Sequence, residues 1–143
     1  MRGRDEGAAM VEFVLLAVVL VVPLCYIVLA VFDLQSAAFG ANAATREAAR
    51  VFVRAPSTAD GERQAEAAAA LTLADHGIDL DSSALVLSCS ATPCLTPGAT
   101  VQVSYRSTVR LPFIPVLGSR EIASVPISAT HTQVVDEYSE IRP

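Results

Sequence analysis

The sequence is poor in the residues that most often build catalytic or metal-binding sites. It has two histidines, three cysteines and no tryptophan, and all of its basic residues are arginines. It contains no G-x-S-x-G motif, no glycine-rich phosphate loop and no metal-binding signature. Its formal net charge is −5, which is not the basic character of nucleic-acid-binding domains. These absences argue against catalysis by this chain, against a bound cofactor or metal, and against nucleic acid as a partner.

The main feature that is present is a long apolar run near the N-terminus. From Phe13 to Phe32 no residue is charged, and about 20 such residues in a helix can cross a hydrocarbon core of about 30 Å. With 143 residues in total, the rest of the chain suffices for one small domain. The sequence therefore predicts a single-pass membrane protein that also contacts the lipid bilayer.

A cleavable secretory signal peptide is the alternative interpretation of this run. The apolar part of such a peptide spans roughly 7–15 residues, follows a net-positive start and ends at a small-x-small cleavage site. Here the run is longer, and Arg2 and Arg4 are offset by Asp5 and Glu6. Residues 41–43 (Ala-Asn-Ala) imitate a cleavage site but lie far beyond the run. We therefore expect the segment to stay in the mature protein.

Glu12 is the only charged residue between Ala8 and Phe32. A carboxylate inside a spanning helix is costly, so it is a candidate for function, and snorkelling toward the headgroups is the alternative. After a cut behind Gly7, Ala8 would be the first residue, Glu12 the fifth and Phe13 the sixth. This pattern, followed by a long apolar run, resembles the cleavage site of type IV prepilins. It is most similar to the TadE-like pseudopilins of tight-adherence (Tad/Flp) pilus systems.

The resemblance implies a set of roles and partners. A prepilin peptidase would cut after Gly7 on the cytoplasmic side, and Glu12 and Phe13 would act in assembly, with Glu12 meeting the amine of a neighbouring subunit. The implied partners are other Tad pseudopilins, the major Flp pilin and the pilus assembly platform with its ATPase. No catalytic activity is implied. Leaders in this family are usually basic, whereas Asp5 and Glu6 stand here.

The chemistry of the segment agrees with such a role for Ala8 and Glu12. Cleavage would leave an α-amino group at Ala8, which is largely cationic near neutral pH. Glu12 lies four residues on, and residues at that spacing share a helix face. Each charge alone is costly in a low dielectric, and pairing recovers much of that cost. Gly7 before the cut suits a protease cleft because it has no Cβ.

Beyond Phe32 we expect the helix to continue to Ala55, because apolar residues recur at helical spacing and Pro56 ends the pattern. Continuous from Ala8, this helix would be about 70 Å long. The recurring residues are mostly small: Leu34, Ala37, Ala38, Ala41, Ala44, Ala48 and Val51. They can pack either on the protein's own domain or on another subunit.

A second stripe on the same segment is basic and consists of Arg46, Arg50 and Arg54. We expect a solvated face here rather than a lipid or partner site. The segment from Asn42 to Phe52 is similar to the Ala-rich, Arg-containing stretch that follows the membrane helix in TadE-like proteins. Pro23 within the run and Asp33 after it agree with that resemblance.

The remaining sequence predicts a small α+β domain. Ser57 or Thr58 caps a second helix that runs to about His76 and stops at Gly77. The helix is Ala-rich and only mildly amphipathic, so we expect it to lie on a sheet. Three strands follow, at Ser83–Ser90, Ala99–Val109 and Ile122–Val134. Pro126 makes the last one an edge strand or a broken strand, and the two prolines of Leu111–Gly118 predict an apolar loop.

Cys89 and Cys94 bracket a turn, Ser-Ala-Thr-Pro, between two strands. A disulfide is expected there in an exported domain, with free thiols as the alternative. Zinc would need two further ligands, and only His76 and His131 remain. Cys25 is interpreted as a buried apolar side chain of the membrane helix.

Together these observations predict an α+β protein in three parts: a prepilin-type leader at residues 1–7, a transmembrane and protruding helix at 8–55, and an extracytoplasmic domain at 56–143. Arg2 and Arg4 favour a cytoplasmic N-terminus before processing, and Arg46, Arg50 and Arg54 start too far beyond the run to reverse that. The expected function is that of a minor pseudopilin in Tad/Flp pilus assembly. The alternative is an unprocessed, single-pass membrane-anchored extracytoplasmic binding domain.

Overall fold

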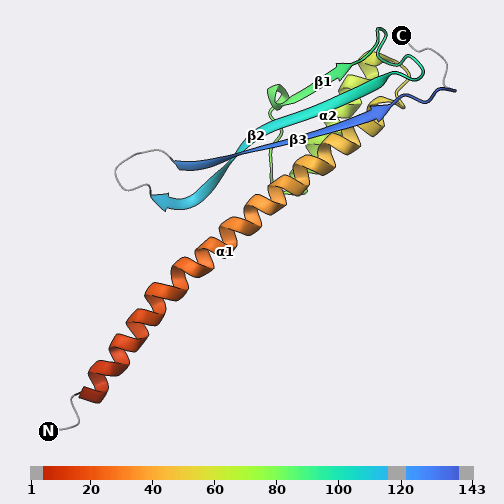
Figure 1. Ribbon diagram of the computed structural model, residues 1–143. Helices are drawn as coiled ribbons and strands as arrows, with labels where there is room; N and C mark the ends of the chain where they lie inside the picture. Colours follow the sequence, from red (N-terminus) through yellow and green to blue (C-terminus); the bar gives the residue numbers. More distant parts are fainter. Residues whose placement is uncertain (1–4, 116–121, 139–143) are drawn as a thin grey trace. The chain divides into compact units, whose positions relative to one another are not determined.

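The computed structural model describes residues 5–115 and 122–138 (Figure 1). The elements in chain order are α1 (Asp5–Phe52), α2 (Thr58–Ala74), the 3-10 helix η1 (Ser82–Ala84), β1 (Leu85–Cys89), β2 (Thr100–Pro115) and β3 (Ile122–Val134). The predicted α+β fold class, with a long N-terminal helix, a second helix and a three-stranded antiparallel sheet, is confirmed. The chain divides into two compact units, Met1–Asp33 and Leu34–Pro143.

The second unit has a core in which small helix residues meet the inner face of the sheet. The buried side chains of α1 are mostly alanines, and those of α2 include Ala65, Ala69 and Leu73. They share one hydrophobic cluster with Val101, Val103 and Tyr105 of β2. The alanine stripe of α1 therefore packs within its own unit, which decides between the two alternatives left open by the sequence. Its members in the cluster are Ala37, Ala41, Ala44 and Ala48.

The sheet has strand order β1-β2-β3 with both pairs antiparallel. Along β2, Val101, Val103 and Tyr105 are buried, whereas Gln102 and Arg106 are exposed, as expected for a sheet with one face on the core and one in solvent. β3 is an edge strand that contains Pro126, in agreement with the first of the two alternatives stated for it.

β2 is longer than predicted. Residues 111–115 were expected to belong to a loop, but they continue β2, and Pro115 is the register partner of Ile122. The loop prediction is wrong for these residues, and the rest of it, 116–118, lies outside the described residues. Proline is excluded from strands that are paired on both sides. Because β1 reaches only to the partner of Tyr105, this end of β2 is paired with β3 alone.

The residues that cap α2 determine where the helix begins and ends. Ser57 is the N-cap, and its hydroxyl accepts a hydrogen bond from the backbone N–H of Asp60. At the other end the helix stops at Ala74, two residues before the predicted position. Gly77 has a φ of +71°, the left-handed conformation that glycine adopts without strain.

Gly40 allows a close contact between α1 and the segment after α2. A Cβ added at this position would lie 2.9 Å from Cγ of His76, and the Nδ1 atom of His76 is 3.3 Å from the hydroxyl oxygen of Ser36. We expect Gly40→Ala to lower the free energy of unfolding by up to about 2 kcal/mol, because overpacking costs about 1–3 kcal/mol and the gain in helix propensity is about 1 kcal/mol.

The same substitution in a His76→Gly background should raise the free energy of unfolding by about 1 kcal/mol, because that background removes both the ring and the Cβ of residue 76, which would lie 3.0 Å from the new Cβ, and only the propensity term remains. Urea unfolding of the full chain in detergent micelles, followed by tyrosine fluorescence, measures both effects. An equal effect of Gly40→Ala in the two backgrounds would show that His76 is not what restricts this position.

Candidate functional site

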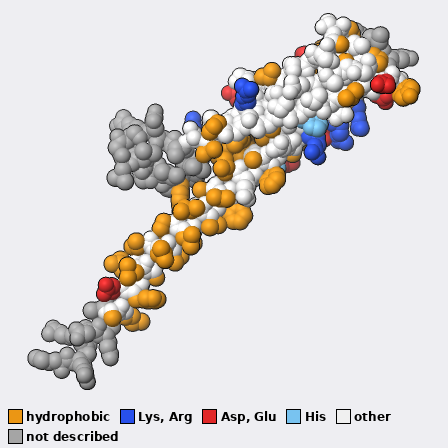
Figure 2. All heavy atoms as spheres, in the orientation of Figure 1, with side chains coloured by type: hydrophobic (Ala, Val, Ile, Leu, Met, Phe, Trp, Pro, Cys, Tyr) orange, Lys and Arg blue, Asp and Glu red, His pale blue; other side chains and the backbone are white. Residues whose placement is uncertain are grey.

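The first part of α1 carries a surface of apolar side chains. Large hydrophobic residues are exposed all along it, from Phe13 at 72 % to Phe32 at 62 %, and Figure 2 shows hydrophobic side chains covering this part of the helix. The helix is long and apolar enough to cross a membrane. Such a surface is unfavourable in water, and the segment is compatible with a single-pass membrane anchor.

Glu12 lies at the beginning of this surface and its side chain is exposed. Gly7 and Ala8 belong to the first turns of the same helix. Ala8 and Glu12 are four residues apart, so they occupy the same face of α1. Within residues 5–115 and 122–138, Glu12 has no hydrogen-bond or ion-pair partner. The structure thus places one carboxylate on an apolar helix surface without a partner in the described chain.

The helical state of Gly7 and Ala8 bears on access to the bond between them. Both residues lie at the N-terminal end of α1, where the first backbone N–H groups have no acceptor within the helix. Unwinding this end therefore breaks few hydrogen bonds. Phe13 follows Glu12 directly and is 72 % exposed, so it contributes to the apolar surface rather than to a core.

The predicted disulfide is present. Cys89, the last residue of β1, is bonded to Cys94 with a Cα–Cα distance of 5.3 Å. Cys25 was interpreted as buried, but it is a free and exposed cysteine on α1. The interpretation was wrong about burial within the protein, because the large apolar side chains described for the first half of α1 are exposed on the helix surface.

We expect loss of the Cys89–Cys94 bond to lower the free energy of unfolding by about 2 kcal/mol, the chain-entropy value for a loop this short. The double variant Cys89→Ala/Cys94→Ala should unfold at lower urea concentration than the oxidised wild type. Dithiothreitol should shift the wild type to the same midpoint and leave the double variant unchanged. A wild-type midpoint that is insensitive to reduction would contradict the expectation.

The histidines do not form a metal site in the part of the chain that is described. No group of three or more His, Cys, Asp or Glu residues gathers among the described residues. His76 contacts Ser36 and the backbone at Gly40. His131, in β3, shares the strand face of the buried Ala129 and is half-buried.

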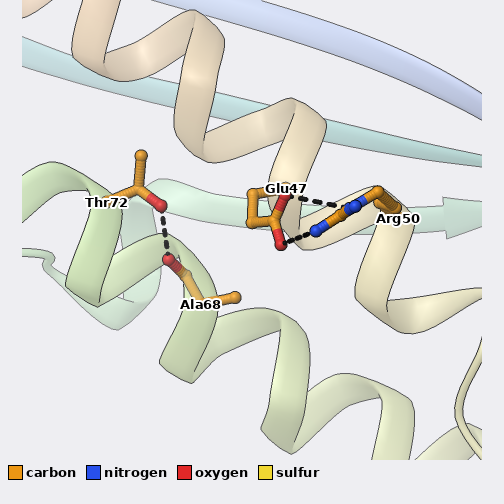
Figure 3. A network of polar contacts seen from close by, with 4 residues as sticks. All are labelled: Glu47, Arg50, Ala68 and Thr72. Atoms are coloured by element: carbon orange, nitrogen blue, oxygen red, sulfur yellow. Dashed lines mark hydrogen bonds and ion pairs between the residues drawn. The ribbon is translucent and has the colours of Figure 1, made fainter.

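The arginine stripe, in which Arg46 and Arg50 belong to α1 and Arg54 follows its end, is largely a solvated surface. Figure 3 shows Arg50 beside Glu47 on the same helix; the guanidinium donates two hydrogen bonds to the carboxylate, at 2.7 and 3.0 Å. This contact raises the pKa of Arg50. Arg46 and Arg54 are exposed. The stripe therefore agrees with the solvated alternative.

Comparison with known proteins gives no assignment, because no family model, no curated protein and no solved structure matches this chain. A functional proposal therefore rests on the residues themselves. The strongest arrangement is the sequence from Gly7 to Phe13 at the head of an exposed apolar helix. A second feature is the part of β2 beyond Tyr105, which is paired with β3 alone. Sequence reasoning missed it because the point at which β1 begins is not visible in the residues of β2, and because the prolines of residues 111–115 predicted a loop.

Proposed function

We propose that the chain is a TadE-like minor pseudopilin that takes part in the assembly of Tad/Flp adhesive pili. The observation that supports this most is the position of Glu12. It is the one charged residue between Ala8 and Phe32, and it has no hydrogen-bond or ion-pair partner among residues 5–115 and 122–138. It lies one helical turn from the Gly7–Ala8 junction, on a helix whose following apolar side chains are exposed. A membrane anchor needs the apolar surface but has no use for the carboxylate, which lowers the stability of the inserted helix.

In the proposed mechanism a prepilin peptidase removes residues 1–7 and creates an amine at Ala8. The carboxylate of Glu12 pairs with the amine of a neighbouring subunit, and Phe13 and the apolar residues after it pack against the neighbouring helices. The pair is directional because one amine and one carboxylate per chain can match in only one axial register. Apolar packing alone would allow several registers, since the residues from Val14 to Leu20 are all aliphatic.

The proposal includes a topology and a set of partners. The N-terminus is cytoplasmic before processing, the apolar part of α1 spans the cytoplasmic membrane, and the unit Leu34–Pro143 is extracytoplasmic. The Cys89–Cys94 bond supports this orientation, because disulfides persist in oxidising compartments. The partners are the prepilin peptidase, other Tad pseudopilins, the major Flp pilin, the assembly platform and the lipid bilayer.

An unprocessed membrane-anchored binding domain is the second candidate. It is favoured by the compact unit Leu34–Pro143, which has a sheet with a solvent-exposed polar face. Replacement of Glu12 separates the two candidates: the pseudopilin loses pilus assembly, whereas the anchored domain keeps its function.

A further inference from the structure

The unpaired end of β2 is a candidate surface for binding another polypeptide. β1 begins at Leu85, whose register partner is Tyr105, while the pairing of β2 with β3 stays regular as far as Arg110. Residues 107–110 of β2 thus have a strand neighbour on one side only. We call the side of these residues that faces away from β3 the open edge.

The hydrogen bonds at the start of β2 show which backbone groups point toward the open edge. Ser90 donates to the carbonyl oxygen of Thr100, on the β1 side, and Val135 donates to that of Ala99, on the β3 side. Backbone groups alternate between the two sides along a strand. The N–H and C=O groups of Thr108 and Arg110 therefore face the open edge, beyond the first residue of β1.

An open hollow extends from η1 across this part of β2 to β3, and its η1 side adjoins the open edge. Its volume is about 720 Å³, and it is lined by Asp81, Ser83, Ala84, Arg106, Ser107, Thr108, Pro126, Ile127 and Ser128. Before β1 the chain forms the turn of η1, in which the backbone N–H of Ala84 donates to the carbonyl oxygen of Asp81. No described residue therefore forms a strand beside residues 107–110 on this side. A strand from a partner could bind there, next to β2 and in line with β1.

The side chains beside the open edge favour an acidic segment. Arg106, Thr108 and Arg110 are exposed and lie on the same face of β2. Neither arginine has an ion-pair partner among the described residues. A carboxylate opposite Thr108 on an added strand would have Arg106 and Arg110 as its two diagonal neighbours, a distance that long side chains can bridge.

Asp81 restricts the position of an acidic residue on the added strand. Its carboxylate accepts hydrogen bonds from the hydroxyl and the backbone N–H of Ser83, at 2.7 and 2.9 Å, and these contacts hold the pKa of Asp81 below its usual value. It is therefore an anion at the η1 end of the hollow. A partner segment is expected to carry its acid away from that end.

We propose that the open edge of β2 binds an extended, acidic segment of another protein by strand addition, with its carboxylate between Arg106 and Arg110. Main-chain hydrogen bonds to Thr108 and Arg110 supply affinity, and the two arginines supply selectivity. The surface lies in the unit Leu34–Pro143 and requires neither cleavage at Gly7 nor the carboxylate of Glu12.

The test measures binding of a fluorescein-labelled peptide with one acidic residue, Thr-Val-Thr-Val-Glu-Val-Thr-Val-Thr, to the full chain in detergent micelles by fluorescence anisotropy. Thr108→Pro removes the N–H that faces the partner without removing a hydrogen bond to β3, and we expect it to weaken binding about tenfold. Thr108→Val keeps the N–H and is the matched control, with binding within about twofold of wild type. Circular dichroism verifies that both variants are folded.

Two further experiments change the peptide backbone and the two arginines. Peptides N-methylated at the groups that face the edge should lose binding to the wild type, which tests the main-chain contacts without any protein variant. Arg106→Gln/Arg110→Gln should weaken binding by about 2–30-fold, the combined range for two charge pairs, and should abolish its salt dependence. The neutral analogue with Gln for Glu should be insensitive to that double variant.

Three outcomes would overturn the proposal. The first is equal binding to Thr108→Pro and Thr108→Val, and the second is equal affinity for the Glu and Gln peptides. The third is that analytical ultracentrifugation shows self-association of the wild-type protein and that Thr108→Pro abolishes it. The open edge would then bind a second copy of the chain rather than another protein.

Discussion

Glu12→Val is expected to abolish pilus assembly while the protein remains in the membrane. If the carboxylate pairs with the Ala8 amine of a neighbour, its removal leaves that cation unpaired in a low dielectric. Breaking such a pair costs about 3–5 kcal/mol, so incorporation should fall by more than about a hundredfold. Insertion of α1 should persist or improve, because the helix loses its one costly side chain. Electron microscopy of pili and immunoblots of membrane fractions measure the two quantities.

Val11→Ala is the matched control for this prediction. Val11 precedes Glu12 and is 69 % exposed, so its replacement perturbs the same helix end without changing charge, and piliation should be retained. Normal piliation by the Glu12→Val strain would contradict the pairing mechanism and favour the anchored binding domain.

Phe52→Ala is expected to have the largest effect on the stability of the second unit. Phe52 is 1 % exposed, and its ring packs against α2 so closely that a Cβ at Gly61 would lie 3.0 Å from Cδ2. Truncation of a buried phenylalanine costs about 3–5 kcal/mol, which is a large part of the roughly 5–15 kcal/mol that stabilises a domain. Urea unfolding followed by far-ultraviolet circular dichroism measures the loss.

Phe39→Ala serves as the control, because Phe39 lies on the same helix and is 69 % exposed. Its replacement should change the free energy of unfolding by less than about 0.5 kcal/mol. Equal effects of the two substitutions would mean that α1 does not dock on α2 through Phe52.

Local signals in the sequence were sufficient to predict the helices. The uncharged run after Glu12 indicated the first part of α1, and Ser57 and Gly77 marked the ends of α2 to within two residues. Pro126 correctly indicated an edge strand, since a missing N–H is tolerated there. These features depend on residues close together in the chain, which is why a single sequence contains them.

Features that depend on distant parts of the chain could not be predicted. Alanines such as Ala44 and Ala48 can pack on any small surface, so their stripe gave no information about its partner. The prolines at 112 and 115 argue against a strand only if that strand is paired on both sides. Whether it is paired on both sides depends on the length of β1, which residues 111–115 do not encode. The Cys89–Cys94 bond was predicted because both cysteines flank one short turn.

The most direct test of the proposed function is the intact mass of the membrane-extracted protein from strains with and without the prepilin peptidase. We expect a species that begins at Ala8 in the first strain and a species that retains Met1–Gly7 in the second. The new amine would then lie one helical turn from Glu12, as pairing between subunits requires. Retention of Met1–Gly7 in both strains would contradict the pseudopilin mechanism, because no amine would be available at Ala8.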